Sequence, residues 1–528
     1  MTSLTQTGKC KFMLITDDIA ITKMAKSLPD VEDATASRYG GWGSGGSDSP
    51  KKGVFIIRSP STALRFSQYA QNRTKMALES FKTTKTISCS LYPSSAILGP
   101  FLGQNYLPYQ QAGIEFIIER KRVLLADPPG LGKTIQIAGV LNQLRPKNVL
   151  IVCPASLRLN WQQELKKWLS YSPEKLEIVS VDSVWRKSVY SRLVMTPFDF
   201  MAVDEAHYIK ESKSKRSMAC ASLASKTPRV VLMTGTPIKN RPRDAFNLLH
   251  ILDDEIFPDY RSFTLRYCAA FQQVIRISGG RTRTIWNDDG SSHEEELQDI
   301  LRSTVMLRRL KEDALPQLPR KRRQLIEIEG SFASVKAEEA AWDAACQRVG
   351  YEEALKQMES GGGVVFSEMA SLRQEVALNK VPFVVEHVMN LVQSGEKVIL
   401  FAHHRAVVSA LFDGLKDCNP VIYVGGMKER QKDDAKKKFM ENPECMVFIG
   451  NIQAAGTGLT LTVSSTVVFA EMSYCPSEME QCEDRACRIG QAASSVLVQH
   501  IVLSGSLDVE MGRRLLEKQR IANEILDV

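Results

Sequence analysis

Short runs of apolar residues recur along the chain, and each run leads into a turn with polar residues. One set of runs lies at 123–127, 149–154, 200–205 and 230–236. A second set lies at 397–404, 421–426, 446–451 and 467–471. Helix-like segments separate the members of each set, and this alternation is typical of a parallel α/β sheet. The pattern therefore predicts two α/β lobes of similar plan.

The remaining segments follow other patterns. In residues 1–100, strand-like runs at 11–16 and 53–58 are each followed by a helix-like segment, which predicts a small α+β domain. Residues 255–395 are charged and mostly helix-like, without a comparable strand run, and 279–292 has the composition of an exposed hairpin or loop. We expect domains at 1–100, 101–325 and 326–528, with helical insertions at about 255–325 and 330–395 and a final helix at 507–525.

Size and composition limit the possibilities. A chain of 528 residues is too long for one hydrophobic core, so roughly two to four domains are expected. Its 44% hydrophobic and 24% charged residues are the balance of a globular protein. A run of about 18 uncharged apolar residues is missing, and the N-terminus lacks the features of a signal peptide. We expect no membrane partner and an intracellular location, in the cytoplasm or nucleoid for a bacterial or phage protein and in the nucleus for a eukaryotic one.

Cysteine usage and net charge add little. The 11 cysteines include no C-x-x-C pair, which argues against structural zinc and against a disulfide framework. The net charge of +8 favours polyanionic partners only weakly. We expect a monomer without structural zinc.

Chemistry enters at the turn after the first apolar run. Residues 123–127 are followed by Pro-Pro-Gly-Leu-Gly-Lys-Thr and an apolar helix, the order of elements that cradles phosphate groups. Lys133 would reach the β- and γ-phosphates of ATP, and the Thr134 hydroxyl would bind Mg²⁺. The general pattern G-x-x-x-x-G-K-[ST] has a glycine where this chain has Asp127, and a chance Gly-Lys-Thr in a loop is the alternative. The predicted nucleotide contacts of this loop are Asp127, Gly130, Leu131, Gly132, Lys133 and Thr134.

An acidic pair, Asp204 and Glu205, follows the third apolar run, where α/β sheets place their ligands. Asp204 would hold Mg²⁺ through water, and Glu205 would orient or deprotonate the attacking water. Taken alone, the pair could equally be a solvated strand end with helix-capping acids. The phosphate loop upstream favours the catalytic interpretation.

The fourth run ends in the turn Thr234-Gly235-Thr236, which precedes a proline. Such a turn is suited to sensing the γ-phosphate and to coupling with His207. In isolation, an ordinary Gly-Pro turn is the better interpretation.

In the second lobe, Gln481, Arg485 and Arg488 are spaced to share one face of a helix. Two arginines displayed in this way can stabilise charge on a transferring phosphate, as arginine fingers do. The alternative is a surface helix whose arginines pair with Glu483 and Asp484.

The order of these motifs resembles superfamily-two helicases, and more narrowly SWI/SNF-type DNA-dependent ATPases. The narrower resemblance is carried by 107–113 (a Q motif), by D-x-x-G-L-G-K-T at 127–134, by 304–313 with 318–319, and by 453–459 and 484–491. It covers roughly residues 104–510. The resemblance implies that Gln110 reads the adenine, that Gly456 and Gly458 lie at the nucleotide, and that Gln481 and Gln491 take part in coupling.

Within that family, the chain looks most like the HARP-containing annealing-helicase branch, which remodels stalled replication forks. This likeness rests on Phe401-Ala-His403-His404, on 468–471 and on the compact spacing of the lobes. The unit at 1–100 is similar in outline to the small DNA-recognition domain of the branch. His403 and His404 have no Cys or acidic partner at ligand spacing, so packing at a strand end is favoured over metal binding.

The phosphate loop departs from the family at Pro128 and Pro129, which replace an acidic residue and a methionine. Two prolines stiffen the loop but remove no liganding group. We therefore expect activity to persist.

The resemblance implies that a DNA duplex crosses both lobes. Arg158 and Asn160, at the start of a helix, are available to backbone phosphates, whereas Trp161 is more simply a core residue. A basic run could also contact phosphate, although a charged run is usually a solvated face. Its members are Arg320, Lys321, Arg322 and Arg323.

These inferences converge on an α/β protein with two RecA-like lobes and a small N-terminal α+β domain. The expected function is a DNA-dependent ATPase that uses Mg-ATP to translocate on double-stranded or branched DNA and to remodel it. An RNA-directed or transcription-linked motor of the same superfamily is one alternative. A DNA-binding adaptor without catalysis is the other.

Overall fold

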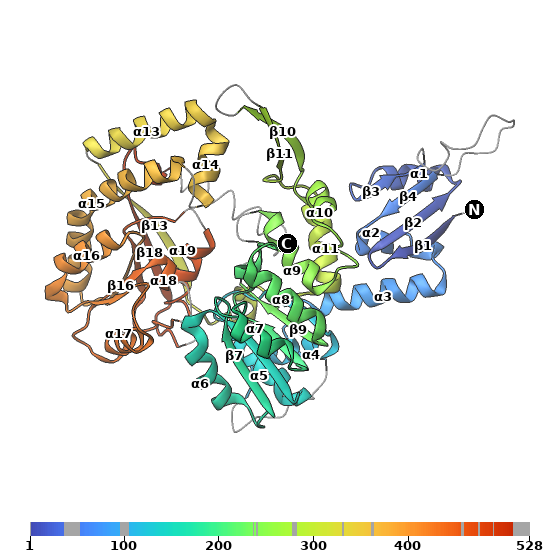
Figure 1. The fold of residues 1–528 in the computed structure, drawn as a ribbon, viewed down its shortest axis with the longest axis horizontal. Helices are drawn as coiled ribbons and strands as arrows, with labels where there is room; N and C mark the ends of the chain where they lie inside the picture. The colour runs from blue at the N-terminus through green and yellow to red at the C-terminus, as the bar shows by residue number, and fades with distance from the viewer. Residues whose placement is uncertain are drawn as a thin grey trace. The chain divides into compact units, whose positions relative to one another are not determined.

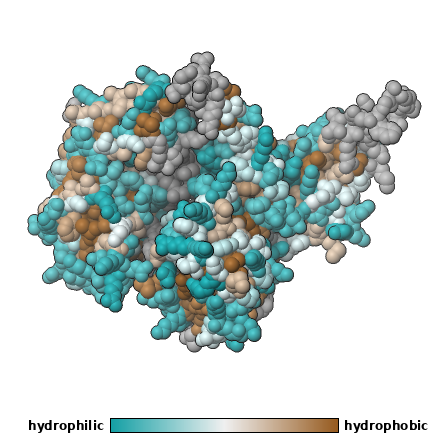
Figure 2. Space-filling view, in the orientation of Figure 1, coloured by the Kyte–Doolittle hydropathy of each residue, from teal (hydrophilic) through white to brown (hydrophobic). Residues whose placement is uncertain are grey.

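The structure is a computed structural model. It describes residues 2–35, 53–94, 105–235, 237–238, 241–276, 282–329, 332–360, 364–455, 459–473, 476–488 and 490–509. The chain divides into two compact units between Ala314 and Leu315, and each is described by itself. Within the described part, every helix is too short or too polar to cross a membrane. Hydrophilic residues predominate on the face that Figure 2 shows, with hydrophobic residues scattered among them.

The N-terminal domain is a four-stranded antiparallel sheet with three helices (Figure 1). The strands run in the order β1 (Ser3–Gly8), β2 (Lys11–Thr16), β4 (Gly53–Ile57) and β3 (Val31–Asp33). The helices are α1 (Ile19–Lys26), α2 (Pro60–Leu64) and α3 (Asn72–Ile87). The strands predicted at 11–16 and 53–58 are confirmed, and alternate residues of both, such as Phe12 and Phe55, are fully buried.

The first lobe contains a six-stranded sheet in which every pairing is parallel. The strand order is β12 (Met306–Leu307), β5 (Arg122–Leu125), β9 (Arg229–Met233), β8 (Phe200–Val203), β6 (Asn148–Cys153) and β7 (Lys175–Ser180). The helices are α4 (Pro108–Glu119), α5 (Lys133–Leu144), α6 (Arg158–Trp168), α7 (Lys187–Val194), α8 (Lys215–Lys226), α9 (Phe246–Leu252), α10 (Tyr260–Tyr267), α11 (Glu294–Thr304) and α12 (Lys311–Ala314).

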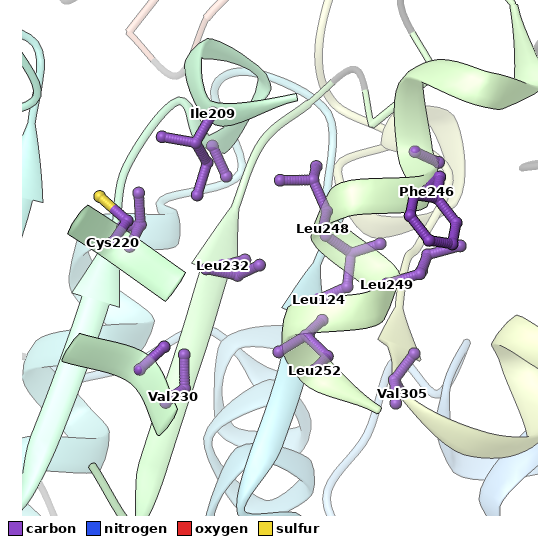
Figure 3. Close-up of a cluster of buried hydrophobic side chains, with 14 of the residues drawn as sticks. Leu124, Ile209, Cys220, Val230, Leu232, Phe246, Leu248, Leu249, Leu252 and Val305 are labelled. Carbon is purple, nitrogen blue, oxygen red and sulfur yellow. The ribbon is translucent and has the colours of Figure 1, made fainter. Parts of the chain in front are cut away.

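Both faces of this sheet are covered. Because successive strand residues point to opposite faces, Leu124 packs into one hydrophobic cluster and Val123 and Leu125 into another. Figure 3 shows the first cluster, where Leu232 of β9 and Leu248 of α9 lie among the buried side chains. Burial on both faces explains the continuous apolar runs that mark these strands in the sequence.

The second lobe contains another six-stranded sheet with parallel pairings throughout. The strand order is β13 (Arg320–Ile328), β18 (Ser495–Leu503), β17 (Thr466–Phe469), β14 (Val398–Ala402), β16 (Val447–Asn451) and β15 (Val421–Tyr423). The helices are α13 (Ala333–Val349), α14 (Tyr351–Ser360), α15 (Val364–Gln393), α16 (Arg405–Gly414), α17 (Glu429–Glu441), α18 (Ile452–Ala455) and α19 (Pro476–Glu483). The predicted plan of two parallel α/β lobes is confirmed.

The expectation that 255–395 contains no substantial strand is wrong. β13, nine residues long, pairs with β18 along its whole length, and it lies at the edge of the sheet, where most of its side chains are exposed. An exposed edge strand does not need an apolar run, so the sequence pattern did not reveal β13, whose first residues are basic.

In the first unit, β10 (Phe271–Arg276) and β11 (Thr282–Asn287) pair as an antiparallel ribbon, which begins earlier than the hairpin or loop expected at 279–292. Most of the final helix expected at 507–525 falls outside the described residues.

Candidate nucleotide-binding site

The carboxyl ends of three adjacent strands meet at one edge of the first sheet. Leu125 of β5 is in register with Met233 of β9, and Leu232 of β9 with Val203 of β8. Because the strands are parallel, the residues that follow them emerge at the same edge. The structure thus brings together the phosphate loop after β5, the acidic turn after β8 and the polar turn after β9.

The phosphate loop leads directly into helix α5, which begins at Lys133. Gly132, at the N-cap, has a φ of 72°, a left-handed conformation that glycine adopts without strain. A Cβ there would lie 2.6 Å from Gln110 Nε2, so any larger residue would also have to displace the end of the Gln110 side chain. Lys133 Nζ donates to the carbonyl oxygen of Asp127 at 2.8 Å, which keeps the ammonium group within the loop. A helix N-terminus with a lysine in the loop is a site for phosphate groups.

Asp127 is buried and supports the loop through its carboxylate. The backbone N and the Nε of Arg309 both donate to its Oδ1 at 3.1 Å, and Gln136 Nε2 donates to Oδ2 at 3.0 Å. Burial raises the pKa of Asp127, but the Arg309 charge and the hydrogen bonds outweigh that effect and hold the pKa below its ordinary value. Both carboxylate oxygens of Asp127 therefore accept hydrogen bonds inside the protein. Asp127 replaces the first glycine of the general loop pattern, and the sequence did not reveal that Arg309 is its partner.

The acidic turn is organised by a tryptophan. Trp161 Nε1 donates to Asp204 Oδ2 at 2.9 Å, and the backbone N of Glu205 donates to Asp204 Oδ1 at 2.9 Å. Burial, with the neighbouring charge of Glu205 as the second cause, raises the pKa of Asp204 to about 6. The prediction that Trp161 is a core residue is confirmed, since the side chain is fully buried. Its hydrogen bond to Asp204 was not predicted.

His207 connects the acidic turn with the polar turn. Its Nδ1 lies 3.3 Å from Glu205 Oε2 and 3.3 Å from Thr234 Oγ1. This is the juxtaposition that the sequence led us to expect for coupling. Gly235 follows Thr234 at the turn, and Thr236 lies outside the described residues.

These residues suit ATP and Mg²⁺. A carboxylate and a hydroxyl, from Asp204 and Thr134, are the hard oxygen ligands that Mg²⁺ takes. A divalent cation would also offset the mutual repulsion of Asp204 and Glu205, which contributes to the raised pKa of Asp204. Gln110, predicted to read the adenine, is buried against the loop and accepts a hydrogen bond from the backbone N of Leu107 at 3.0 Å.

In the second unit, the expectation that Gln481, Arg485 and Arg488 share one helix face is wrong. Helix α19 ends at Glu483, and the arginines follow it in a turn. Arg485 is buried and donates to the carbonyl of Leu459 at 3.1 Å, because the turn folds back on the loop at 459–461. Arg488 is half-buried, and its Nη1 donates to Thr460 Oγ1 at 3.0 Å.

The two glutamines predicted to take part in coupling lie within the second unit. Gln481 is buried, and Gln491 Nε2 donates to the carbonyl of Ser464 at 2.8 Å. Gly456 and Gly458 lie outside the described residues.

The basic run of β13 is divided between two environments. Lys321 Nζ lies 3.0 Å from Glu483 Oε2 and 2.9 Å from Asp484 Oδ1, and Arg323 also pairs with Glu483. Lys321 is therefore largely buried against internal carboxylates rather than open to DNA, whereas Arg323 pairs with Glu483 and still exposes much of its side chain. Arg320 and Arg322 are exposed.

The remaining DNA candidates lie at the start of α6. Arg158 is exposed and Asn160 is half-buried.

The pair His403 and His404 packs at the end of β14, as predicted. Glu471 accepts from the backbone N of both residues, at 2.7 and 2.8 Å, and lies 2.6 Å from His404 Nδ1. Glu471 is the acidic partner that the sequence spacing did not reveal.

Two protein families match this chain. The SNF2-related domain matches residues 109–191 and 177–338, and the helicase conserved C-terminal domain matches residues 379–490. A SWI/SNF-related matrix-associated actin-dependent regulator of chromatin subfamily A-like protein 1 from Xenopus tropicalis is 32% identical over 449 residues, covering 80% of this chain and 45% of that protein. The DNA annealing helicase and endonuclease ZRANB3 from Homo sapiens is 31% identical over 474 residues, covering 84% of this chain and 43% of that protein.

A solved structure, the Sulfolobus solfataricus SWI2/SNF2 ATPase core in complex with dsDNA, is 20% identical, with 82% of this chain and 100% of that chain covered and a TM-score of 0.38. The chain spans less than half the length of the two curated relatives. Both lobes carry a matched domain, one on each parallel sheet. The chain therefore belongs to the SNF2-related family of helicase-type proteins.

Proposed function

We propose that this protein is a DNA-dependent ATPase that translocates on double-stranded or branched DNA and remodels it. The observation that carries the proposal is the meeting of three turns at one sheet edge, where His207 lies 3.3 Å from both Glu205 and Thr234 beside the phosphate loop. Phosphate-binding, water-activating and sensing groups are what nucleotide hydrolysis requires.

We propose a role for each residue of this site. Lys133 would bind the β- and γ-phosphates, and Thr134 and Asp204 would hold the magnesium ion. When bound, magnesium supplies positive charge that offsets the charge developing on the phosphate oxygens. Glu205 would orient the attacking water, since its backbone is fixed by the bond to Asp204.

The second lobe would complete the reaction. Arg485 and Arg488 are held by the loop at 459–461, so that loop and both arginines form one unit. Their guanidinium groups would stabilise the transferring phosphate when the lobes close. Hydrolysis would then depend on lobe geometry, which gives DNA a means of gating it.

An annealing type of activity on DNA is supported by one relative. It is named a DNA annealing helicase and endonuclease, and it aligns with 84% of this chain. We propose branched DNA, such as a fork, as the substrate of this protein, with the N-terminal domain as a reader of DNA structure.

ATP turnover by the full chain tests the proposal. It should be measured without nucleic acid and with linear duplex, fork DNA and RNA, and with Lys133→Ala as the inactive reference. We expect fork DNA to stimulate turnover at least as well as linear duplex, and RNA to stimulate it little. Strongest stimulation by RNA would indicate an RNA-directed motor, and turnover equal to that of the Lys133→Ala protein would indicate an adaptor.

A further inference from the structure

Asp299, on α11, joins the N-terminal domain to the first lobe. Its carboxylate accepts hydrogen bonds from Ser59 Oγ at 2.8 Å, from the backbone N of Ser61 at 2.9 Å and from Lys85 Nζ at 2.5 Å. Burial raises the pKa of Asp299, but the bonds from Lys85 and Ser61 outweigh that effect and hold the pKa below its ordinary value. An ionised, buried carboxylate thus ties α2 and α3 to α11.

The same domain also contacts the segment that follows α11. This helix leads through the short strand β12 into Arg308 and Arg309. The backbone N of Arg308 donates to the carbonyl of Ser88, the C-cap residue of α3, at 3.1 Å. Helices α3 and α11 lie side by side (Figure 1). The N-terminal domain therefore contacts α11 at Asp299 and the segment after α11 at Arg308.

The two arginines hold the elements around the nucleotide site. Arg308 Nη1 donates to the carbonyls of Ala126, at 2.7 Å, and Gly235, at 3.1 Å, so it joins the start of the phosphate loop to the polar turn. Arg309 donates to the carboxylate of Asp127 and, at 2.8 Å, to Gln136 Oε1 of α5. The Arg309 side chain is fully buried, so it is not placed to contact DNA directly.

We propose that Arg308 and Arg309 are positioning residues for nucleotide hydrolysis, and that docking of the N-terminal domain on Asp299 and Arg308 fixes their positions. The inference rests on the proposed ATPase function and assigns the route by which the N-terminal domain acts on it. Without the dock, α11 keeps its packing in the core of the lobe but loses the contacts that fix Asp299 and Arg308, and the phosphate loop loses part of the support that orders its N–H groups for phosphate.

The test compares variants of the full chain. Asp299→Ala removes the carboxylate contacts of the dock and leaves the backbone bond between Arg308 and Ser88, and Lys85→Met weakens the carboxylate contacts at a partly exposed residue, so folding is preserved. Arg309→Lys keeps the charge but reaches fewer acceptors. Lys9→Ala is the matched control, because Lys9 pairs with Asp253 of the first lobe, outside the segment from α11 to Arg309. The readouts are the dissociation constant of a fluorescent ATP analogue with Mg²⁺, kcat and KM for ATP, and the unfolding midpoint.

We expect Asp299→Ala and Arg309→Lys to raise the dissociation constant and KM about tenfold, Lys85→Met to raise both in the same direction, and Lys9→Ala to change neither. An Asp299→Ala protein and a Lys85→Met protein that both bind the analogue as tightly as the wild type would overturn the inference. Nucleotide binding is measured without DNA and without turnover. A wild-type protein that binds the analogue but never hydrolyses ATP would therefore refute the proposed function while still allowing this test.

Discussion

Arg309 donates to the carboxylate of Asp127 from both its backbone and its guanidinium group, across 182 residues of sequence. Neither side chain reaches solvent. Removing one member of a buried ion pair leaves the other charge buried without its partner, which is costly, so this pair should contribute more to stability than an exposed ion pair does.

Replacing Asp127 by Asn should lower the free energy of unfolding by about 3 to 5 kcal/mol, because the Arg309 guanidinium remains buried without a countercharge. Denaturant titration of the full chain measures the change. Glu174→Gln is the control, since its pair with Lys147 is largely exposed and should contribute less than about 1 kcal/mol. An Asp127→Asn protein as stable as the control would show that the pair does not hold the fold.

Trp161→Phe keeps the buried ring but removes the N–H that holds Asp204. A carboxylate ligand without its supporting hydrogen bond is less well oriented, so the magnesium concentration for half-maximal turnover should rise about 10- to 100-fold. A magnesium titration of ATP turnover gives this value. Trp168→Phe serves as the control because the Trp168 N–H donates to Glu164 instead. Equal magnesium requirements in the two variants would contradict the prediction.

Glu205→Gln should separate binding from chemistry. The amide cannot accept a proton from the attacking water, so turnover should fall about 10² to 10⁴-fold while nucleotide affinity stays near that of the wild type. Single-turnover hydrolysis and analogue binding report the two quantities. Glu211→Gln, at an exposed position shortly after the motif, should leave both unchanged. Loss of affinity in the Glu205→Gln protein would assign Glu205 to binding rather than to catalysis.

Arg320→Gln and Arg322→Gln should each weaken duplex binding, because both side chains are exposed and carry no carboxylate partner in the part of the chain that the structure describes. Each variant should reduce the slope of log affinity against log salt by about 0.9. Lys321→Met should instead destabilise the second lobe, since Glu483 and Asp484 would lose a buried countercharge. Unchanged salt slopes would remove β13 from the DNA-binding surface.

The sequence predicted the strands that form continuous apolar runs and missed those that do not. β7 and β13 lie at sheet edges, and few of their residues are fully buried. β12 is also an edge strand, but both of its residues are fully buried, and a strand of two residues is too short to give a recognisable run. β18 is buried, but Gln499 and His500 interrupt its apolar run. Local sequence patterns therefore predicted the existence of the two lobes, but they did not predict the full set of strands in each sheet.

The candidate site divides in a similar way. The turns at Lys133, Asp204 and Thr234 are local motifs, and parallel strands bring them together by topology alone. The support from Trp161 and Arg309 depends on contacts between side chains far apart in the chain, which no local pattern records. The ion pairs of Lys321 are of the same kind, and they turned an apparent DNA contact into an internal one.

The distance in sequence between Asp127 and Arg309 also sets an order of assembly during synthesis. When the phosphate loop leaves the ribosome, the guanidinium that neutralises its first residue has not yet been made. β12 pairs with β5 only after the rest of the first sheet has been translated, and Arg309 follows two residues later. A nascent chain that stops short of this point contains every phosphate-loop residue but still carries an uncompensated charge at Asp127.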